Sequence, residues 1–269
     1  MPWLDIEGTD LHYVDEGPRD GQTLVFLHGF TSCAEAWFQQ FDFFRALGTG
    51  GRGFRLVALD SVNHGMSSNS PREEDEPDRA DEVDALLRAL EIERPVLLGN
   101  SMGGNTLLRW ATRHPERAAA LVPSGTGVSS EAAQTRLPRR SLDLDTLVLP
   151  IGDSLTDEFA EREPRLYQRY LRMRSTASSI ENLRHPRRPS EASRTERGEL
   201  AERVQKICSP MLVVVGSLDA ARPRAEELHK RVSHSEYACI EGAPHNVYYE
   251  AAAEYNALVA DFLERTLSG

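Results

Sequence analysis

The sequence has no apolar run approaching the roughly 18 residues that a helix needs to cross a bilayer. Cysteine is scarce: Cys33, Cys208 and Cys239 are widely spaced and odd in number, which excludes a disulfide framework and a zinc-type cysteine pair. Positive charge is in deficit, because 31 Lys and Arg stand against 42 Asp and Glu, for a net charge of −11. The charge argues against nucleic acid or an anionic membrane surface as a partner.

The N-terminal residues show no targeting signal, and the middle of the chain has no lysine. The N-terminal Met-Pro-Trp-Leu-Asp lacks the basic and then apolar pattern of a secretory signal, so we expect a reduced, cytoplasmic enzyme. Lysine is absent between residues 125 and 205, where 14 Arg balance 13 Asp and Glu. This block differs in composition from its flanks and has no convincing strand. We therefore predict a core made of residues 1–124 and 206–269, with residues 125–205 inserted as a helical cap.

Apolar runs and helical patterns alternate along the predicted core. Strands read as short, unbroken apolar runs, which is typical of a parallel sheet that helices cover on both faces. We predict an α/β fold with a mostly parallel, eight-stranded sheet and the cap after the sixth strand. The predicted strands are 3–6, 11–14, 24–27, 55–59, 96–98, 118–123, 211–215 and 235–240, and the predicted helices are 34–47, 78–90, 105–114, 222–232 and 249–267.

One of these junctions carries a chemical motif. Residues 96–104 read Val-Leu-Leu-Gly-Asn-Ser-Met-Gly-Gly, a strand that ends in Gly-x-Ser-x-Gly just before a helix-like segment. This context predicts a nucleophile elbow, a sharp turn that exposes the Ser101 hydroxyl. Gly99 and Gly103 fit because so tight a turn leaves no room for Cβ atoms beside the nucleophile.

A serine nucleophile needs a base and a carboxylate to orient that base. We searched the carboxyl ends of the predicted strands, where ligands bind in open parallel sheets. Asp219 follows one strand in Gly-Ser-Leu-Asp, and His245 follows the last strand in Gly-Ala-Pro-His. The order Ser101, Asp219, His245 is that of elbow-type hydrolases. The alternative for Asp219 is a turn residue that caps the next helix.

The positions of these motifs predict further site residues. The oxyanion hole is predicted to use the backbone N–H of Met102 and of Phe30, with His28 as a structural anchor of the Phe30 loop. Trp37, Asn100, Val247 and Tyr248 are candidate pocket residues. Arginines of the cap recur at helical spacing. They either offer a group such as Arg169 or Arg172 to an acidic substrate, or form pairs with neighbouring acids on the helix surface.

Five ordered segments together resemble the α/β-hydrolase superfamily: Leu27-His28-Gly29-Phe30, Leu59 to Ser67, Gly99 to Gly104, Gly216 to Asp219 and Gly242 to His245. Asn100 before the serine is similar to hydrolases that cleave carbon–carbon bonds of ring-fission products. The Asn-His-Gly-x-Ser loop at 63–67 is similar to esterases and thioesterases. His28 to Thr31, with His245 to Glu250, is similar to the menaquinone-pathway synthase that eliminates pyruvate. Dehalogenases and epoxide hydrolases use an Asp nucleophile, so Ser101 counts against both.

These observations predict a serine hydrolase that cleaves an ester, thioester or lactone of a small molecule through an acyl-enzyme. Carbon–carbon cleavage of a keto-dienoate and lyase chemistry remain alternatives that use the same triad. A protein that only holds a ligand in the pocket is a third possibility. The mechanism requires no metal or cofactor, and the oligomeric state is not readable from the sequence.

Overall fold

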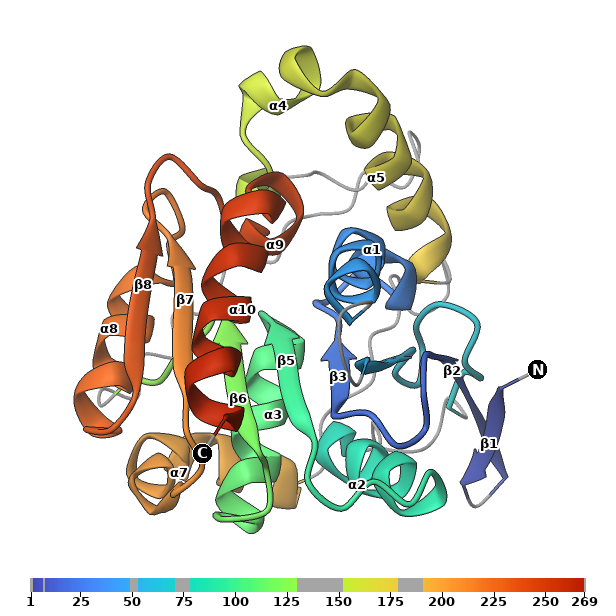
Figure 1. Ribbon diagram of the computed structural model, residues 1–269, viewed down its shortest axis with the longest axis vertical. Helices are drawn as coiled ribbons and strands as arrows, with labels where there is room; N and C mark the ends of the chain where they lie inside the picture. The colour runs from blue at the N-terminus through green and yellow to red at the C-terminus, as the bar shows by residue number, and fades with distance from the viewer. Residues whose placement is uncertain are drawn as a thin grey trace.

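The computed structural model describes residues 2–6, 8–48, 53–70, 78–129, 152–178 and 191–268, and its centre is an eight-stranded sheet (Figure 1). The order across the sheet is β1-β2-β4-β3-β5-β6-β7-β8. β2 pairs antiparallel with β1 and β4, and the remaining pairings are parallel. The predicted fold class is thus confirmed. The strands are β1 Trp3–Ile6, β2 Thr9–Glu16, β3 Thr23–Leu27, β4 Arg55–Leu59, β5 Val96–Asn100, β6 Ala120–Ser124, β7 Leu212–Gly216 and β8 Glu236–Ile240.

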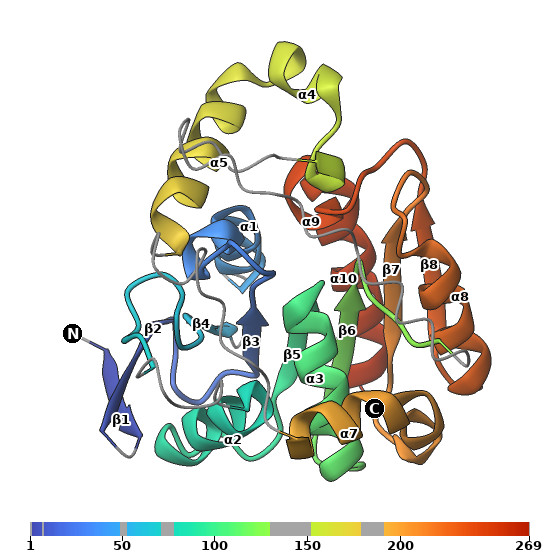
Figure 2. The same ribbon diagram turned by 180° about the vertical axis from the view of Figure 1, so that it is seen from behind.

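Helices cover both faces of this sheet (Figures 1 and 2). One face packs against α1 Phe38–Leu47, α9 Val247–Glu250 and α10 Ala252–Leu267. The other face packs against α2 Arg79–Ala89, α3 Met102–Arg113 and α8 Arg222–Arg231. The other described helices are α4 Asp157–Arg162, α5 Pro164–Ala177 and α7 Glu191–Arg203, with short 3-10 turns at Ala34–Trp37, Gly152–Ser154 and Val204–Lys206.

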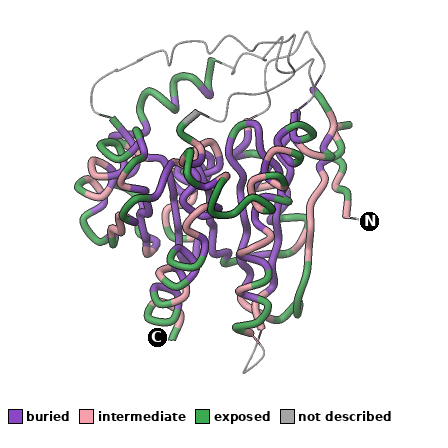
Figure 3. Tube along the Cα trace, turned by 90° about the horizontal axis from the view of Figure 1, so that it is seen from above, coloured by how far each residue is buried: buried purple, intermediate pink, exposed green. Residues whose placement is uncertain are grey.

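The central strands are buried on both faces, which explains their unbroken apolar sequences. Successive side chains of a strand point to opposite faces, so Leu24 and Phe26 join one core cluster while Val25 and Leu27 join the other. Figure 3 shows the same arrangement from above, with buried strands between helices whose outer turns are exposed. The sheet is therefore a rigid platform, and polar residues just past its strands are held in defined places.

Only part of the predicted cap lies over the carboxyl edge of the sheet. α4 and α5 stand above the carboxyl ends of the strands, whereas α7 lies at the opposite end beside α3 (Figures 1 and 2). The cap residues 130–151 and 179–190 lie outside the described residues. The boundaries 125 and 205 stay predictions.

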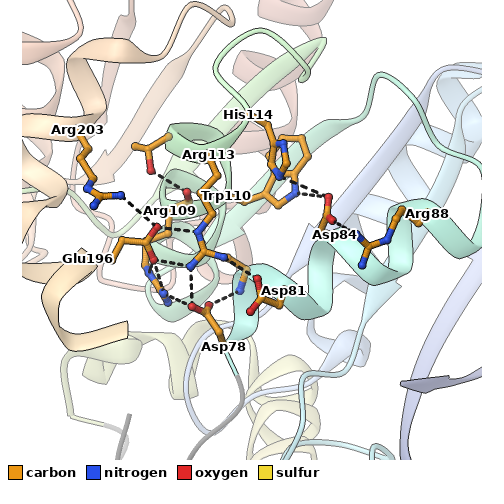
Figure 4. A network of polar contacts seen from close by, with 12 residues as sticks. Asp78, Asp81, Asp84, Arg88, Arg109, Trp110, Arg113, His114, Glu196 and Arg203 are labelled. Atoms are coloured by element: carbon orange, nitrogen blue, oxygen red, sulfur yellow. Dashed lines mark hydrogen bonds and ion pairs between the residues drawn. The ribbon is translucent and has the colours of Figure 1, made fainter. Parts of the chain in front are cut away.

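Charged side chains hold α7 in that place (Figure 4). Glu196 of α7 accepts hydrogen bonds from Arg109 and Arg113 of α3, with nitrogen–oxygen distances of 2.5–2.9 Å. Asp78, just before α2, accepts from the same two arginines at 2.5 and 2.6 Å. Arg109 is only 1% exposed, so these carboxylates take the place of water around its buried guanidinium. The network thus ties α7, near the end of the predicted cap, to α3 and to the start of α2.

Several helix boundaries differ from the sequence prediction. The predicted helix 34–47 begins as a 3-10 turn, Ala34–Trp37, and becomes α-helical at Phe38. The helix after the elbow begins at Met102 rather than Asn105, although Gly103 and Gly104 are poor helix formers. The predicted helix 249–267 is two helices, because Ala251 has a non-helical backbone (φ −105°, ψ 39°) between α9 and α10. In these last two places tertiary contacts override local propensity.

Candidate active site

Ser101 occupies a strained turn between β5 and α3. Its backbone has φ 54° and ψ −109°, and its N–H donates to the carbonyl oxygen of Ser124 at 2.8 Å. The flanking glycines are required by space: a Cβ on Gly99 would lie 2.4 Å from the Gly103 oxygen, and one on Gly103 would lie 2.1 Å from the Leu27 oxygen. The strand, turn and helix expected around Ser101 are therefore present. A strained residue that the surroundings hold in place is a feature of functional sites.

Asp219 and His245 form a close pair. His245 Nδ1 lies 3.0 Å from both carboxylate oxygens of Asp219, and Asp219 is only 4% exposed. Asp219 Oδ1 also accepts the N–H of Ala221 at 2.8 Å, so the residue serves as turn and as partner of the imidazole. Because a carboxylate only accepts, Nδ1 is the nitrogen that donates, and in the neutral ring the lone pair then lies on Nε2. This is the tautomer that a general base requires.

Three loops meet around Gly125, which follows β6 and has a φ of +55°. The position that a Cβ would take on Gly125 lies 2.9 Å from Asn100 Oδ1, 2.9 Å from the His245 carbonyl oxygen and 3.3 Å from Asp219 Oδ2. Asn100, Asp219 and the loop that carries His245 thus all pack against the Cα of Gly125. The Ser101 hydroxyl makes no hydrogen bond with another described residue.

The Phe30 loop lies against the elbow. A Cβ on Gly29 would be 3.5 Å from the Ser101 Cβ, which is an ordinary contact distance. Neither the Phe30 nor the Met102 amide donates to an acceptor in the described part of the chain. Two N–H groups beside a serine are what an oxyanion hole needs. Their role as that hole stays a prediction.

Buried polar groups anchor this loop. Asp60 Oδ1 accepts the N–H of Ala34 at 2.7 Å, and His28 Nε2 accepts the N–H of Ser61 at 3.1 Å while its Nδ1 donates to the Gly29 oxygen at 2.8 Å. Burial lowers the pKa of His28 below its ordinary value, and burial lowers that of His64 to about 3. Both rings are therefore neutral at physiological pH. His28 has the contacts of an anchor, as the sequence predicted.

The four predicted pocket residues are all buried. Trp37, Val247 and Tyr248 are at most 1% exposed and belong to the core cluster under α1 and α10. The Trp37 and Tyr248 rings pack with centroids 4.1 Å apart. Asn100 is fully buried and donates from Nδ2 to Asn246 Oδ1 at 2.9 Å. Contact with a substrate stays a prediction for all four.

The arginines of α5 divide into two groups. Arg169 pairs with Glu35 at 3.2 Å and lies over the Phe38 ring, and Arg172 is exposed. Arg174 is 9% exposed and donates from Nη1 to the hydroxyls of Tyr170 at 3.1 Å and Ser154 at 3.2 Å. The sequence singled out Arg169 and Arg172, whereas the structure buries Arg174. Helical spacing alone could not separate them.

A family model described as "alpha/beta hydrolase fold" matches residues 22–252, which is most of the chain. The chain belongs to this family. The predicted resemblance is confirmed. Within the described residues, no helix combines the length and apolarity that a bilayer crossing needs, and the cytoplasmic location stays a prediction.

Individual relatives cover different parts of the chain. A bifunctional esterase/perhydrolase of Acinetobacter calcoaceticus is 28% identical over 60% of this chain and 55% of its own length. A 2-hydroxy-6-oxononadienedioate/2-hydroxy-6-oxononatrienedioate hydrolase of Paraburkholderia xenovorans is 26% identical over 94% of this chain and 90% of its own. Several curated relatives are matched over only 35%, 41% or 55% of their length. The solved enol-lactonase of Burkholderia xenovorans has a TM-score of 0.77 at 24% identity, covers 97% of this chain and 99% of its own, and shows the fold alone.

Proposed function

We propose that the protein hydrolyses an acyl bond of a small molecule, as an ester, thioester or lactone, with Ser101 as nucleophile, His245 as general base and Asp219 as the acid that orients it. The observation that carries the proposal is the Asp219–His245 pair, at 3.0 Å, beside a strained serine elbow. The esterase name of the Acinetobacter relative supports the acyl substrate class.

The chemistry follows the polarity of the groups. His245 Nε2 accepts the Ser101 proton as Oγ attacks the acyl carbon, and the imidazolium that forms is stabilised by the buried Asp219 carboxylate. The N–H groups of Phe30 and Met102 donate to the developing oxyanion. The leaving oxygen or sulfur then takes the proton from His245, and water repeats the sequence to release the acid. No metal or cofactor takes part in this proposal.

Labelling tests this assignment. A fluorophosphonate should add once per chain, at Ser101, as read by intact mass and peptide mapping. Turnover of p-nitrophenyl esters should fall by about 10⁴- to 10⁶-fold in Ser101→Ala. Ester turnover that survives Ser101→Ala, or folded wild-type protein that takes no label, would reject the proposal.

Carbon–carbon hydrolysis of a keto-dienoate is a second candidate. It is favoured by the Paraburkholderia relative, which aligns over 94% of this chain and carries that activity in its name. Both candidates need Ser101, so the substrate decides between them. Turnover of p-nitrophenyl butyrate or a lactone with none of a keto-dienoate supports the acyl hydrolase, and the reverse supports carbon–carbon cleavage.

A further inference from the structure

A line of buried polar side chains runs from the elbow to the cap helix α5. Asn100, the neighbour of Ser101, donates from Nδ2 to Asn246 Oδ1 at 2.9 Å. Asn246, the neighbour of His245, donates from its own Nδ2 to the Tyr170 hydroxyl at 2.7 Å. These three side chains are 0%, 8% and 2% exposed, so water does not take the place of a lost partner.

The same loop is tied to the cap segment before α4 through its backbone. The N–H of His245 donates to the Asp153 oxygen, and the N–H of Asn246 donates to the Ser154 oxygen, both at 3.0 Å. Arg174 Nη1 then joins the two attachments, because it donates to the Ser154 hydroxyl and to the Tyr170 hydroxyl. The loop that carries His245 is therefore attached to the cap in two ways: by its backbone to Asp153 and Ser154, and by the Asn246 side chain to Tyr170.

The Tyr170 oxygen is the point where these attachments meet. It accepts from the Arg174 guanidinium and from the Asn246 amide, and a bond from a charged donor polarises the hydroxyl. With its Nδ2 held by Tyr170, the Asn246 amide must present Oδ1 to Asn100. The hydroxyl thus fixes the orientation of the side chain that follows His245.

We propose that Tyr170 is a positioning residue, through which α5 sets the place of His245 relative to Ser101. The inference rests on the proposed function, since it assigns His245 the role of base. Without the hydroxyl, the Asn246 side chain keeps only its bond from Asn100, and its buried Nδ2 loses its acceptor. His245 then spends less time in line with the serine, which lowers the rate of the chemical step without changing the shape of the substrate site.

The experiment compares Tyr170→Phe with Tyr167→Phe. Both remove one hydroxyl from α5, and the Tyr167 hydroxyl makes no hydrogen bond with another described residue. We would measure kcat and KM on p-nitrophenyl acetate and p-nitrophenyl butyrate, and the rate at which a fluorophosphonate labels Ser101. Tyr170→Phe should lower kcat and the labelling rate by about 10-fold, by the same factor for both esters, with KM within about twofold. Tyr167→Phe should match wild type.

Three results would overturn the positioning role: an unchanged kcat in Tyr170→Phe, a rise in KM alone, or a loss confined to the longer ester. The last two would mean contact with the substrate. Asn246→Ala gives a second measurement if Tyr170→Phe does not fold. It should lower kcat without the KM change that loss of a substrate contact causes. Where both single variants fold, the double variant should be no slower than the slower single variant, and multiplied effects would reject a shared path.

These results are separable from failure of the proposed function. If wild-type turnover does not depend on Ser101, the hydrolase proposal fails and the role of Tyr170 falls with it. If turnover depends on Ser101 and Tyr170→Phe matches Tyr167→Phe, only the positioning role is rejected.

Discussion

Replacing Gly125 with alanine tests whether the three loops of the site depend on one backbone carbon. A Cβ there would lie 2.9 Å from the Asn100 side-chain oxygen and from the His245 carbonyl oxygen. Ordinary carbon–oxygen contacts are about 3.3–3.6 Å, so each oxygen must retreat by about half an ångström. Asp219 Oδ2, at 3.3 Å, is at the short limit of that range and must give by a few tenths of an ångström. The substitution therefore displaces the acid and the histidine loop together.

The magnitude has two parts. The φ of +55° costs a non-glycine residue about 1–2 kcal/mol. Overpacking against the three oxygens adds about 1–3 kcal/mol. We expect Gly125→Ala to lose about 2–5 kcal/mol of unfolding free energy in urea. We also expect kcat to fall by at least about 10-fold, because positioning errors near an ångström cost about 10²-fold.

Two other glycines separate these causes. Gly8 has a φ of +85° with no atom within 4 Å of its Cβ position, so Gly8→Ala carries the conformational cost alone. Gly198 lies in α7 with open space and no positive φ, and Gly198→Ala should raise stability by up to about 1 kcal/mol. Neither variant should lower kcat. If Gly125→Ala keeps the wild-type kcat, or loses no more unfolding free energy than Gly8→Ala loses, then packing on Gly125 does not hold the site together.

Three further variants test other parts of the structure. Asp219→Asn keeps the side-chain shape but presents a wrong group to the imidazole, so kcat should fall by about 10⁴-fold while the Tm stays close to wild type; steady-state kinetics and a thermal melt check this. Burial holds the pKa of His64 at about 3 in the fold against its ordinary 6.5. The unfolded chain therefore binds the extra proton in acid, and this residue's share of stability should fall by about 2 kcal/mol from about pH 7 to about pH 5. Urea titrations at both pH values should show a smaller fall in unfolding free energy for His64→Asn than for wild type. Equal falls in the two proteins would contradict this role of His64. Glu196→Gln should cost about 3–5 kcal/mol in urea unfolding because it weakens the pairing of buried Arg109, whereas Glu199→Gln, on an exposed pair, should cost under about 1 kcal/mol.

The elbow was predictable because its constraint is local. A turn that tight restricts which residues flank it, so Gly99 and Gly103 reveal Ser101 in the sequence. Chain order and position after strands then singled out Asp219 and His245, which the structure pairs. The parallel sheet was predictable for a similar reason, because strands buried on both faces must be apolar throughout.

The rest of the site depends on contacts that spacing does not reveal. Tyr170 reaches Asn246 across 76 residues, and Arg174 is distinguished from Arg169 only by which side of α5 faces the core. Gly103 and Gly104 favoured a later start for α3, yet both are there because neighbouring atoms leave no room for a Cβ. A signal was present in one place: an asparagine directly after a proposed catalytic histidine is a polar residue with no evident surface role.

Asn100 shows why a residue shared with another enzyme class need not report the substrate. Its Nδ2 supplies the hydrogen that Asn246 Oδ1 accepts, and its buried Oδ1 faces Gly125, close to the place that Asp219 Oδ2 also faces. An aspartate here would remove the donor and bring a second negative charge towards Asp219, and a leucine would leave the Asn246 oxygen buried without a partner. The bond to Asn246 therefore gives an amide at this position a structural reason that does not depend on the substrate. The presence of Asn100 before the serine is accordingly no evidence by itself for carbon–carbon cleavage, because its bond to the histidine loop serves an ester hydrolase equally well.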